Sequence, residues 1–223
     1  MLLMMTVSRI RRPLQNRVDP FGTIHAVASR GTLMGNRGGR LHNPDTKELL
    51  KQRKWASKAW ISCCLTSHKG IRREVMGNNS YTELFFLDEV TALAAGHRPC
   101  FHCRRSDAKA FQNAWQEAQN LPKTPKVTEM DPILHDERLR QDRYVIPRDD
   151  LVTGTMILHD DKPLAIKQNL LLEWSFEGYK VSTVGILDLP STVVCLTPPS
   201  IVAVLGCGYE PKWHESSSTH TLS

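Results

Sequence analysis

Residues 85–104 read FFLDEVTALAAGHRPCFHCR, a short apolar segment that runs into a Cys-x-x-Cys pair. Asp88 is a favourable helix N-cap, so we expect a helix over residues 89–95. The pair that follows consists of Cys100 and Cys103. Two thiolates separated by two residues can bind one metal ion, and this spacing is typical of zinc sites. The sequence therefore predicts half of a zinc site in a knuckle after the helix.

The other half of the site must come from elsewhere in the chain, because a structural zinc ion has four ligands that commonly come as two separate pairs. Cys63, Cys64 and His68 lie upstream and are the candidates. Neighbouring residues on a strand point to opposite faces, so Cys63 and Cys64 are not expected to bind the same ion. His42 is an alternative fourth ligand. The predicted metal-ligating residues are Cys63, Cys64, His68, Cys100 and Cys103, with the choice among the first three left open.

Residues 85–104 resemble the second half of the zinc domain of Ada-type methylphosphotriester DNA-repair proteins. In that family a short helix ends in Ala-Gly and an aromatic residue, and Arg-Pro-Cys-x-x-Cys follows. The resemblance implies a zinc module that binds DNA and in which one thiolate ligand accepts a methyl group from a methylated phosphate. Where the family has Cys-x-x-x-Cys in the first half, this chain has Cys64 and His68 at that spacing. Three thiolates and a neutral histidine leave less negative charge on the site than four thiolates, which weakens sulfur as a nucleophile.

Positive charge is concentrated in the first part of the chain. The 223 residues carry a net charge of +6, and residues 1–60 hold 12 of the 29 Lys and Arg residues against three acidic residues. A local positive field beside a zinc site favours a polyanionic partner, which we expect to be nucleic acid and DNA first. A solvated basic leader is the alternative. The predicted nucleic-acid-contacting residues are Arg30, Arg37, Arg40, Arg72, Arg73, Arg104 and Arg105.

Residues 30–40 alternate glycine with arginine and are expected to form a loop. The backbone N–H groups and guanidinium groups of such a loop can cradle phosphate. The stretch matches neither the P-loop nor the dinucleotide-binding fingerprint, both of which follow a strand. A turn-rich loop without this function is therefore the preferred interpretation.

Composition predicts a cytoplasmic protein. The chain has 40% hydrophobic and 23% charged residues and no apolar run long enough to cross a bilayer. The positive charges near the N-terminus follow the first apolar residues, which is the reverse of a secretory signal. Six cysteines without such a signal favour metal ligands and buried thiols over disulfides.

Changes in composition divide the chain and predict an α+β fold. Prolines and lysines at 121–126 mark a linker, and short apolar runs after Pro147 indicate strands. We expect a basic, loop-rich segment at 1–50, a zinc-binding module of β-hairpin and helices at 51–120, a linker with a short helix at 121–144, a β-rich unit with a C-terminal helix at 145–214, and a disordered Ser- and Thr-rich tail at 215–223.

Local signals place further elements within these parts. Ser106 is expected to cap a helix that ends near Gln119, and Asp131-Pro132 to open a short one. Asp45, with Glu48 three residues later, predicts another helix start. Strands are expected within residues 55–65 and 81–87, with 71–76 pairing back on the first of them. In the β-rich unit we expect strands at 155–158, 164–166, 170–174 and 193–196, and a final helix that begins after Pro198.

Three functional hypotheses follow. The first is a zinc protein that binds DNA through its basic N-terminal segment and the edge of the zinc module. The second is an enzyme, either a methyl-accepting repair protein that uses Cys63 or Cys64, or a metal-assisted nuclease that uses His42. The third is a structural zinc protein that serves protein contacts.

Overall fold

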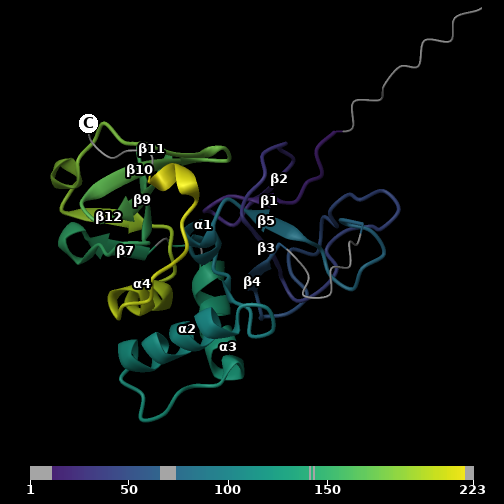
Figure 1. The fold of residues 1–223 in the computed structure, drawn as a ribbon, viewed down its shortest axis with the longest axis horizontal. Coiled ribbons are helices and arrows are strands. Elements are labelled where there is room, and N and C mark those ends of the chain that lie inside the picture. The colour runs from purple at the N-terminus through teal and green to yellow at the C-terminus, as the bar shows by residue number, and fades with distance from the viewer. Residues whose placement is uncertain (1–11, 66–73, 141, 143, 219–223) are drawn as a thin grey trace, which may run out of the picture.

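The computed structural model describes residues 12–65, 74–140, 142 and 144–218, and within them it has two six-stranded sheets and four α-helices. Figure 1 shows the two sheets on opposite sides of α1, with α2, α3 and α4 gathered below it. The predicted α+β class, including a C-terminal helix, is confirmed. No helix in the described ranges is long and apolar enough to span a bilayer.

The first sheet has the strand order β2-β1-β5-β3-β4-β6. Its strands are β1 (Arg17–Val18), β2 (Ile24–His25), β3 (Leu33–Asn36), β4 (Ile61–Cys64), β5 (Leu84–Phe86) and β6 (Arg98–Pro99). The strands expected within residues 55–65 and 81–87 are confirmed as β4 and β5. They do not pair with each other, because β3, which lies far upstream in the sequence, lies between them and pairs with both.

The N-terminal segment does not form the separate loop that its composition predicts. It contributes β1, β2 and β3, and β3 lies within the Gly/Arg stretch. At Gly35 the neighbouring strands approach so closely that a Cβ atom would lie 2.3 Å from the Ile61 carbonyl oxygen. Because Gly35 has no side chain, β3 can lie close to the backbone of β4 in the middle of the sheet. This glycine therefore belongs to a strand and not to a loop.

Two further local expectations near the first sheet are wrong. Residues 45–50 form a turn with a bridge between His42 and Leu49, and the predicted helix is absent. The expected return strand at 71–76 is not confirmed, because residues 71–73 lie outside the described part and 74–76 are not a strand. The described neighbours of β4 are β3 and β6.

The second sheet is antiparallel throughout and has the order β11-β10-β9-β8-β12-β7. Its strands are β7 (Tyr144–Pro147), β8 (Met156–His159), β9 (Lys162–Lys167), β10 (Leu170–Ser175), β11 (Gly178–Val181) and β12 (Thr192–Cys195). Four of them match the predicted strands. Asp160 and Asp161 connect β8 to β9 with φ angles of 46° and 59°, the conformation of a tight hairpin turn that suits Asp.

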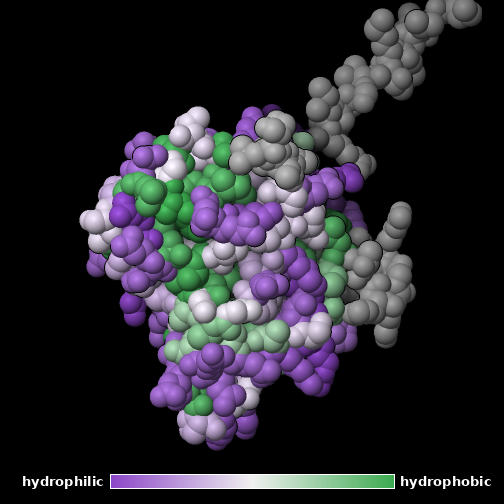
Figure 2. Space-filling model, turned by 60° about the vertical axis from the view of Figure 1, so that its left-hand side comes forward, coloured by the Kyte–Doolittle hydropathy of each residue, from purple (hydrophilic) through white to green (hydrophobic). Residues whose placement is uncertain are grey.

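Both edge strands of the second sheet carry exposed apolar residues. Val145 on β7 and Val181 on β11 are exposed, as are Leu170 and Leu187. Figure 2 brings this side of the molecule forward and shows hydrophobic surface between hydrophilic side chains. On β11 the exposed Lys180 precedes Val181, and a charged side chain at an edge opposes pairing with another chain.

The four helices are α1 (Glu89–Ala94), α2 (Arg105–Ala118), α3 (Val127–Leu139) and α4 (Pro199–Gly206). Helices α1 and α4 begin where the sequence predicts, whereas α2 and α3 begin earlier. Arg104, and not Ser106, is the N-cap of α2. α3 starts at Val127 because the Glu129 carboxylate accepts the Lys126 N–H at 2.6 Å, and Pro132 lies inside the helix.

α1 is buried along its whole length and joins three parts of the core. Ala92 and Ala95 pack with the first sheet, Val90 and Ala94 pack with the second, and Leu93 packs with the other helices. Its two polar residues, Glu89 and Thr91, are buried and hydrogen-bonded.

Asp88, the predicted N-cap of α1, is fully buried and holds distant segments together. Its carboxylate accepts the Thr91 N–H at 2.9 Å, the Tyr179 hydroxyl at 3.1 Å and the His214 N–H at 3.0 Å. The segment after His214 also packs on the second sheet, since the Ser216 hydroxyl accepts the Tyr179 N–H at 2.9 Å. The predicted disorder of the tail is therefore wrong for residues 215–218, and 219–223 lie outside the described part.

Asp88→Ala should lower the free energy of unfolding by about 3 kcal/mol, because it removes a cap and leaves buried donors without an acceptor. Asp149→Ala is the matched control, since the Asp149 side chain is 86% exposed and its loss should change stability by less than about 0.5 kcal/mol. Urea unfolding of both variants measures the difference. Equal stabilities would contradict the role given to Asp88.

Candidate metal centre

Three cysteines from two distant segments meet at one end of the first sheet. The Sγ atoms of Cys63, Cys100 and Cys103 all lie within 4.8 Å of one another. β4 and β6 run parallel with Ser62 opposite Pro99, and the residue that follows each of these two is a cysteine, Cys63 on β4 and Cys100 just after β6. The register of β4 and β6 therefore brings Cys63 next to the Cys-x-x-Cys pair. The number of residues between Cys63 and Cys100 does not by itself determine this contact.

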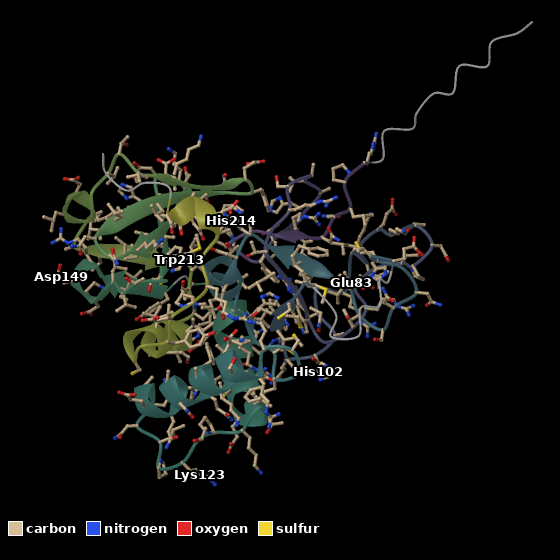
Figure 3. All side chains as sticks on the ribbon, viewed as in Figure 1. Glu83, His102, Lys123, Asp149, Trp213 and His214 are labelled. Atoms are coloured by element: carbon tan, nitrogen blue, oxygen red, sulfur yellow. The ribbon has the colours of Figure 1, made fainter. Side chains whose placement is uncertain are left out.

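The turn after β6 aims its cysteines toward Cys63. The Cys100 N–H donates to the Ser62 carbonyl at 3.0 Å, and the Arg104 N–H donates to the Cys100 carbonyl at 2.9 Å. His102 lies between the two cysteines and is exposed (Figure 3). Its backbone N–H donates to the Cys100 sulfur at 3.4 Å. The knuckle is thus closed by its own backbone and presents both sulfurs on its inner side.

The sulfur atoms differ in their affinity for protons. Hydrogen bonding to Cys100, then burial, raises the pKa of Cys63, whereas the same hydrogen bond lowers the pKa of Cys100 to about 4. Burial raises the pKa of Cys103. Without a metal, these shifts favour Cys100 as a thiolate and Cys63 and Cys103 as thiols. A cation that replaces these protons can hold all three as thiolates.

Cys64 is not part of this group. It lies next to Cys63 on β4, and its thiol donates to the Cys103 carbonyl at 3.4 Å. Its backbone N–H donates to the Cys103 sulfur at 3.4 Å. Only one of these two neighbours on the strand thus has its sulfur in the cluster. Cys64 forms hydrogen bonds with Cys103 and does not join the cluster.

His68 lies outside the described residues, so its place relative to the cluster stays a prediction. The alternative ligand His42 is fully described and is elsewhere. Its Nε2 lies 2.9 Å from the Gly77 carbonyl and its Nδ1 lies 2.6 Å from the Thr82 hydroxyl. Both ring nitrogens are used in a buried pair of hydrogen bonds. His42 is therefore neither a ligand of the cluster nor an accessible nuclease base in this structure.

Arg104, predicted to contact nucleic acid, is buried and supports the knuckle. Its Nη2 lies 2.7 Å from Glu89, and both side chains are only 1% exposed. Its Nη1 donates to the Ser62 hydroxyl at 2.9 Å, and its Nε donates to Asp107 at 2.9 Å. Proximity to the carboxylates stabilises the buried charge, which would otherwise be expensive to desolvate. The assignment of Arg104 to a nucleic-acid surface is therefore wrong.

Glu89 completes this network from the start of α1. Its carboxylate accepts the Tyr209 hydroxyl at 2.6 Å and the Lys212 N–H at 3.0 Å. Sequence reasoning missed Glu89 and Ser62 as supports of the metal centre. Acidic residues are common in the first turn of helices because they interact favourably with the helix dipole. The sequence around Glu89 therefore does not distinguish that ordinary role from a buried pairing with Arg104.

The remaining predicted arginines have different surroundings. Arg37 is 4% exposed, and its Nη2 donates to the Gly22 carbonyl at 2.6 Å, so its expected place on the surface is wrong. Arg40 is half-buried and donates to the Asn79 carbonyl at 2.9 Å. Arg30 and Arg105 are exposed. Arg72 and Arg73 lie outside the described residues.

Comparisons of the chain with protein-family models, curated proteins and solved structures found no match. The Ada-type resemblance therefore stays a prediction. What the chain holds can be judged from its own geometry: three cysteines close enough to bind one metal ion.

Replacing Cys63, Cys100 or Cys103 singly with Ser should abolish tight metal binding, because each change removes one thiolate of the cluster. Cys207→Ser is the matched control, since Cys207 is a half-buried cysteine after α4 and outside the cluster. Metal analysis after dialysis against a weak chelator measures bound metal per chain. Full metal content in the Cys103→Ser variant would contradict the assignment.

Proposed function

We propose that this chain is a zinc-binding protein whose metal centre holds together a surface that contacts DNA. The observation that carries the proposal is the convergence of three cysteine sulfurs within 4.8 Å from β4 and from the turn after β6. The metal would join two strands that are otherwise paired through only two residues of each. Zinc would thus stabilise the sheet end that presents the basic residues.

Ligand chemistry favours zinc over other ions. Thiolate ligands select zinc, copper(I) and iron–sulfur clusters. Three cysteines with one histidine as the fourth ligand are a common ligand set of structural zinc sites. We assign the fourth position to His68, which follows Cys63 by five residues.

Exposed cations beside the knuckle are the basis for proposing DNA as the partner. Arg105 is the first residue of α2, directly after the knuckle, and Lys109 is exposed one turn later. Leu33 pairs with Cys64, so the loop before β3, with the exposed Arg30, lies at the same end of the sheet. Cations grouped in this way contact phosphates and give affinity with little sequence preference.

The geometry does not favour the catalytic alternatives. Cys63 is 7% exposed, so its sulfur is poorly placed to accept a methyl group from a bulky phosphate. Cys64 is more accessible but is not one of the clustered sulfurs that a metal would activate. Both ring nitrogens of His42 are hydrogen-bonded, to the Thr82 hydroxyl and the Gly77 carbonyl, so His42 is not available as the base of a nuclease.

His68→Ala should weaken zinc binding by about tenfold or more. Loss of a residue that only hydrogen-bonds to a metal ligand already lowers metal affinity by about tenfold, and loss of a ligand should cost at least as much. His102→Ala is the matched control, since His102 is exposed in the knuckle and should retain zinc. Competition with a chromophoric chelator measures the affinity, and cobalt(II) substitution reports thiolate coordination. Unchanged affinity in His68→Ala would reject His68 as the fourth ligand.

The zinc-loaded protein should bind duplex DNA with an affinity that falls steeply as salt rises. Arg30→Ala and Arg105→Ala should each weaken binding and reduce the slope of log affinity against log salt by about 1. Lys180→Ala, on the far edge of the second sheet, should change neither. Zinc binding without any DNA binding would reject this role and favour a structural zinc protein that serves protein contacts.

A further inference from the structure

A cavity of about 610 Å³ lies away from the cysteine cluster, where segments from both halves of the chain meet. Its lining comes from residues 20–24, 49–51 and 53–55 of the first half and from residues 137–140, 142 and 195–199 of the second. The end of α1 forms part of its wall through Ala94 and Ala95. A volume of this size is in the range of cavities that hold small organic ligands.

Two guanidinium groups flank one tryptophan in the wall of this cavity. The Cζ atom of Arg37 lies 3.9 Å from the centroid of the Trp60 ring, and that of Arg138 lies 4.3 Å from it. All three residues line the cavity. Both cations therefore contribute positive potential to the same small space.

Neither guanidinium has a carboxylate partner in the part of the chain that the structure describes. The hydrogen-bond acceptors of Arg37 are the Gly22 carbonyl and His97, and those of Arg138 are the Leu134 and Lys58 carbonyls. No described carboxylate oxygen lies within 4.0 Å of either group. Asp19 raises the pKa of Arg37 and Asp131 raises that of Arg138, but each acid pairs with another residue, Asp19 with His25 at 2.7 Å and Asp131 with Arg98 at 2.7 Å.

Buried donors near the cavity are also incompletely satisfied. Arg138 Nη1 and Trp60 Nε1 are buried and have no hydrogen-bond partner among the described residues. Burial lowers the pKa of both Arg37 and Arg138 to about 9, which leaves them charged at pH 7. Buried cations and donors without an acceptor are destabilising, and they mark a place that an anion would stabilise.

The rim of the cavity is also predominantly basic. Lys51, Arg53, Lys54 and Arg140 are exposed cations that line it, against the exposed Asp142 and the carboxylate of Glu137. Glu137 accepts the Ser200 hydroxyl at 2.6 Å, so part of its charge is already engaged. The field at the entrance thus favours the approach of an anion.

We propose that this cavity binds a small phosphorylated ligand, with the phosphate held by Arg37 and Arg138 and the organic part against Trp55 and Leu50. Planar guanidinium groups suit phosphate oxygens because they donate paired hydrogen bonds. The space exceeds what a phosphate ion needs, and the apolar side chains of the lining suit an organic group. This site is independent of the metal centre.

Isothermal titration of the full chain with adenosine monophosphate, inorganic phosphate and adenosine tests the proposal. Adenosine monophosphate should bind, and adenosine should not. Tighter binding of the monophosphate than of inorganic phosphate supports a phosphate ester as the ligand, and equal binding would overturn the contact proposed for its organic part. Failure of both phosphates to bind, or equal binding of adenosine, would overturn the proposal.

Arg138→Met should weaken phosphate binding about tenfold or more, because it removes a charged donor. Lys54→Ala, at the exposed rim, should weaken it by about two- to fivefold. Lys123→Ala is the matched control, since Lys123 lies in the loop between α2 and α3 and does not line the cavity (Figure 3). If Arg138→Met fails to fold, Lys54→Ala decides, and unchanged affinity in that variant overturns the proposal.

Discussion

The buried carboxylates of Asp88 and Glu89 at the start of α1 hold the rest of the structure in place. Asp88 accepts donors from β11 and from the C-terminal segment, and Glu89 accepts the guanidinium of Arg104 and the Tyr209 hydroxyl. Both carboxylates are buried, so each lost donor would leave a charge poorly compensated in a low-dielectric interior. The two sheets and the knuckle therefore meet at one helix end.

This arrangement connects the metal centre to the core through consecutive residues. Cys103 belongs to the sulfur cluster, and Arg104, the next residue, reaches both Glu89 and the hydroxyl of Ser62. Ser62 in turn precedes Cys63 on β4. A metal ion in the cluster would stabilise the same two segments that Arg104 already holds, so metal binding and folding of this region should be coupled.

The basic character of the N-terminal part serves the interior as well as the surface. Arg37 comes from the Gly/Arg stretch, yet it packs over Trp60 in the wall of the cavity, while Arg30 stays exposed. Net charge counts both residues equally. Their surroundings differ because β3 lies within the first sheet: Arg37 directly follows β3 and is buried, whereas Arg30 lies in the loop before β3 and is exposed.

The sequence by itself determined what depends on near neighbours: the helix after Asp88, the Cys-x-x-Cys knuckle, four of the six strands of the second half and the final helix. These follow from caps, short spacings and apolar runs, which act over a few residues. Only the tertiary structure decided that β3 separates β4 from β5, that Cys63 and not Cys64 joins the cluster, and that Arg37 and Arg104 are buried. These outcomes depend on strand register and on partners far away in the chain, such as Glu89 for Arg104, and no local pattern encodes such pairings.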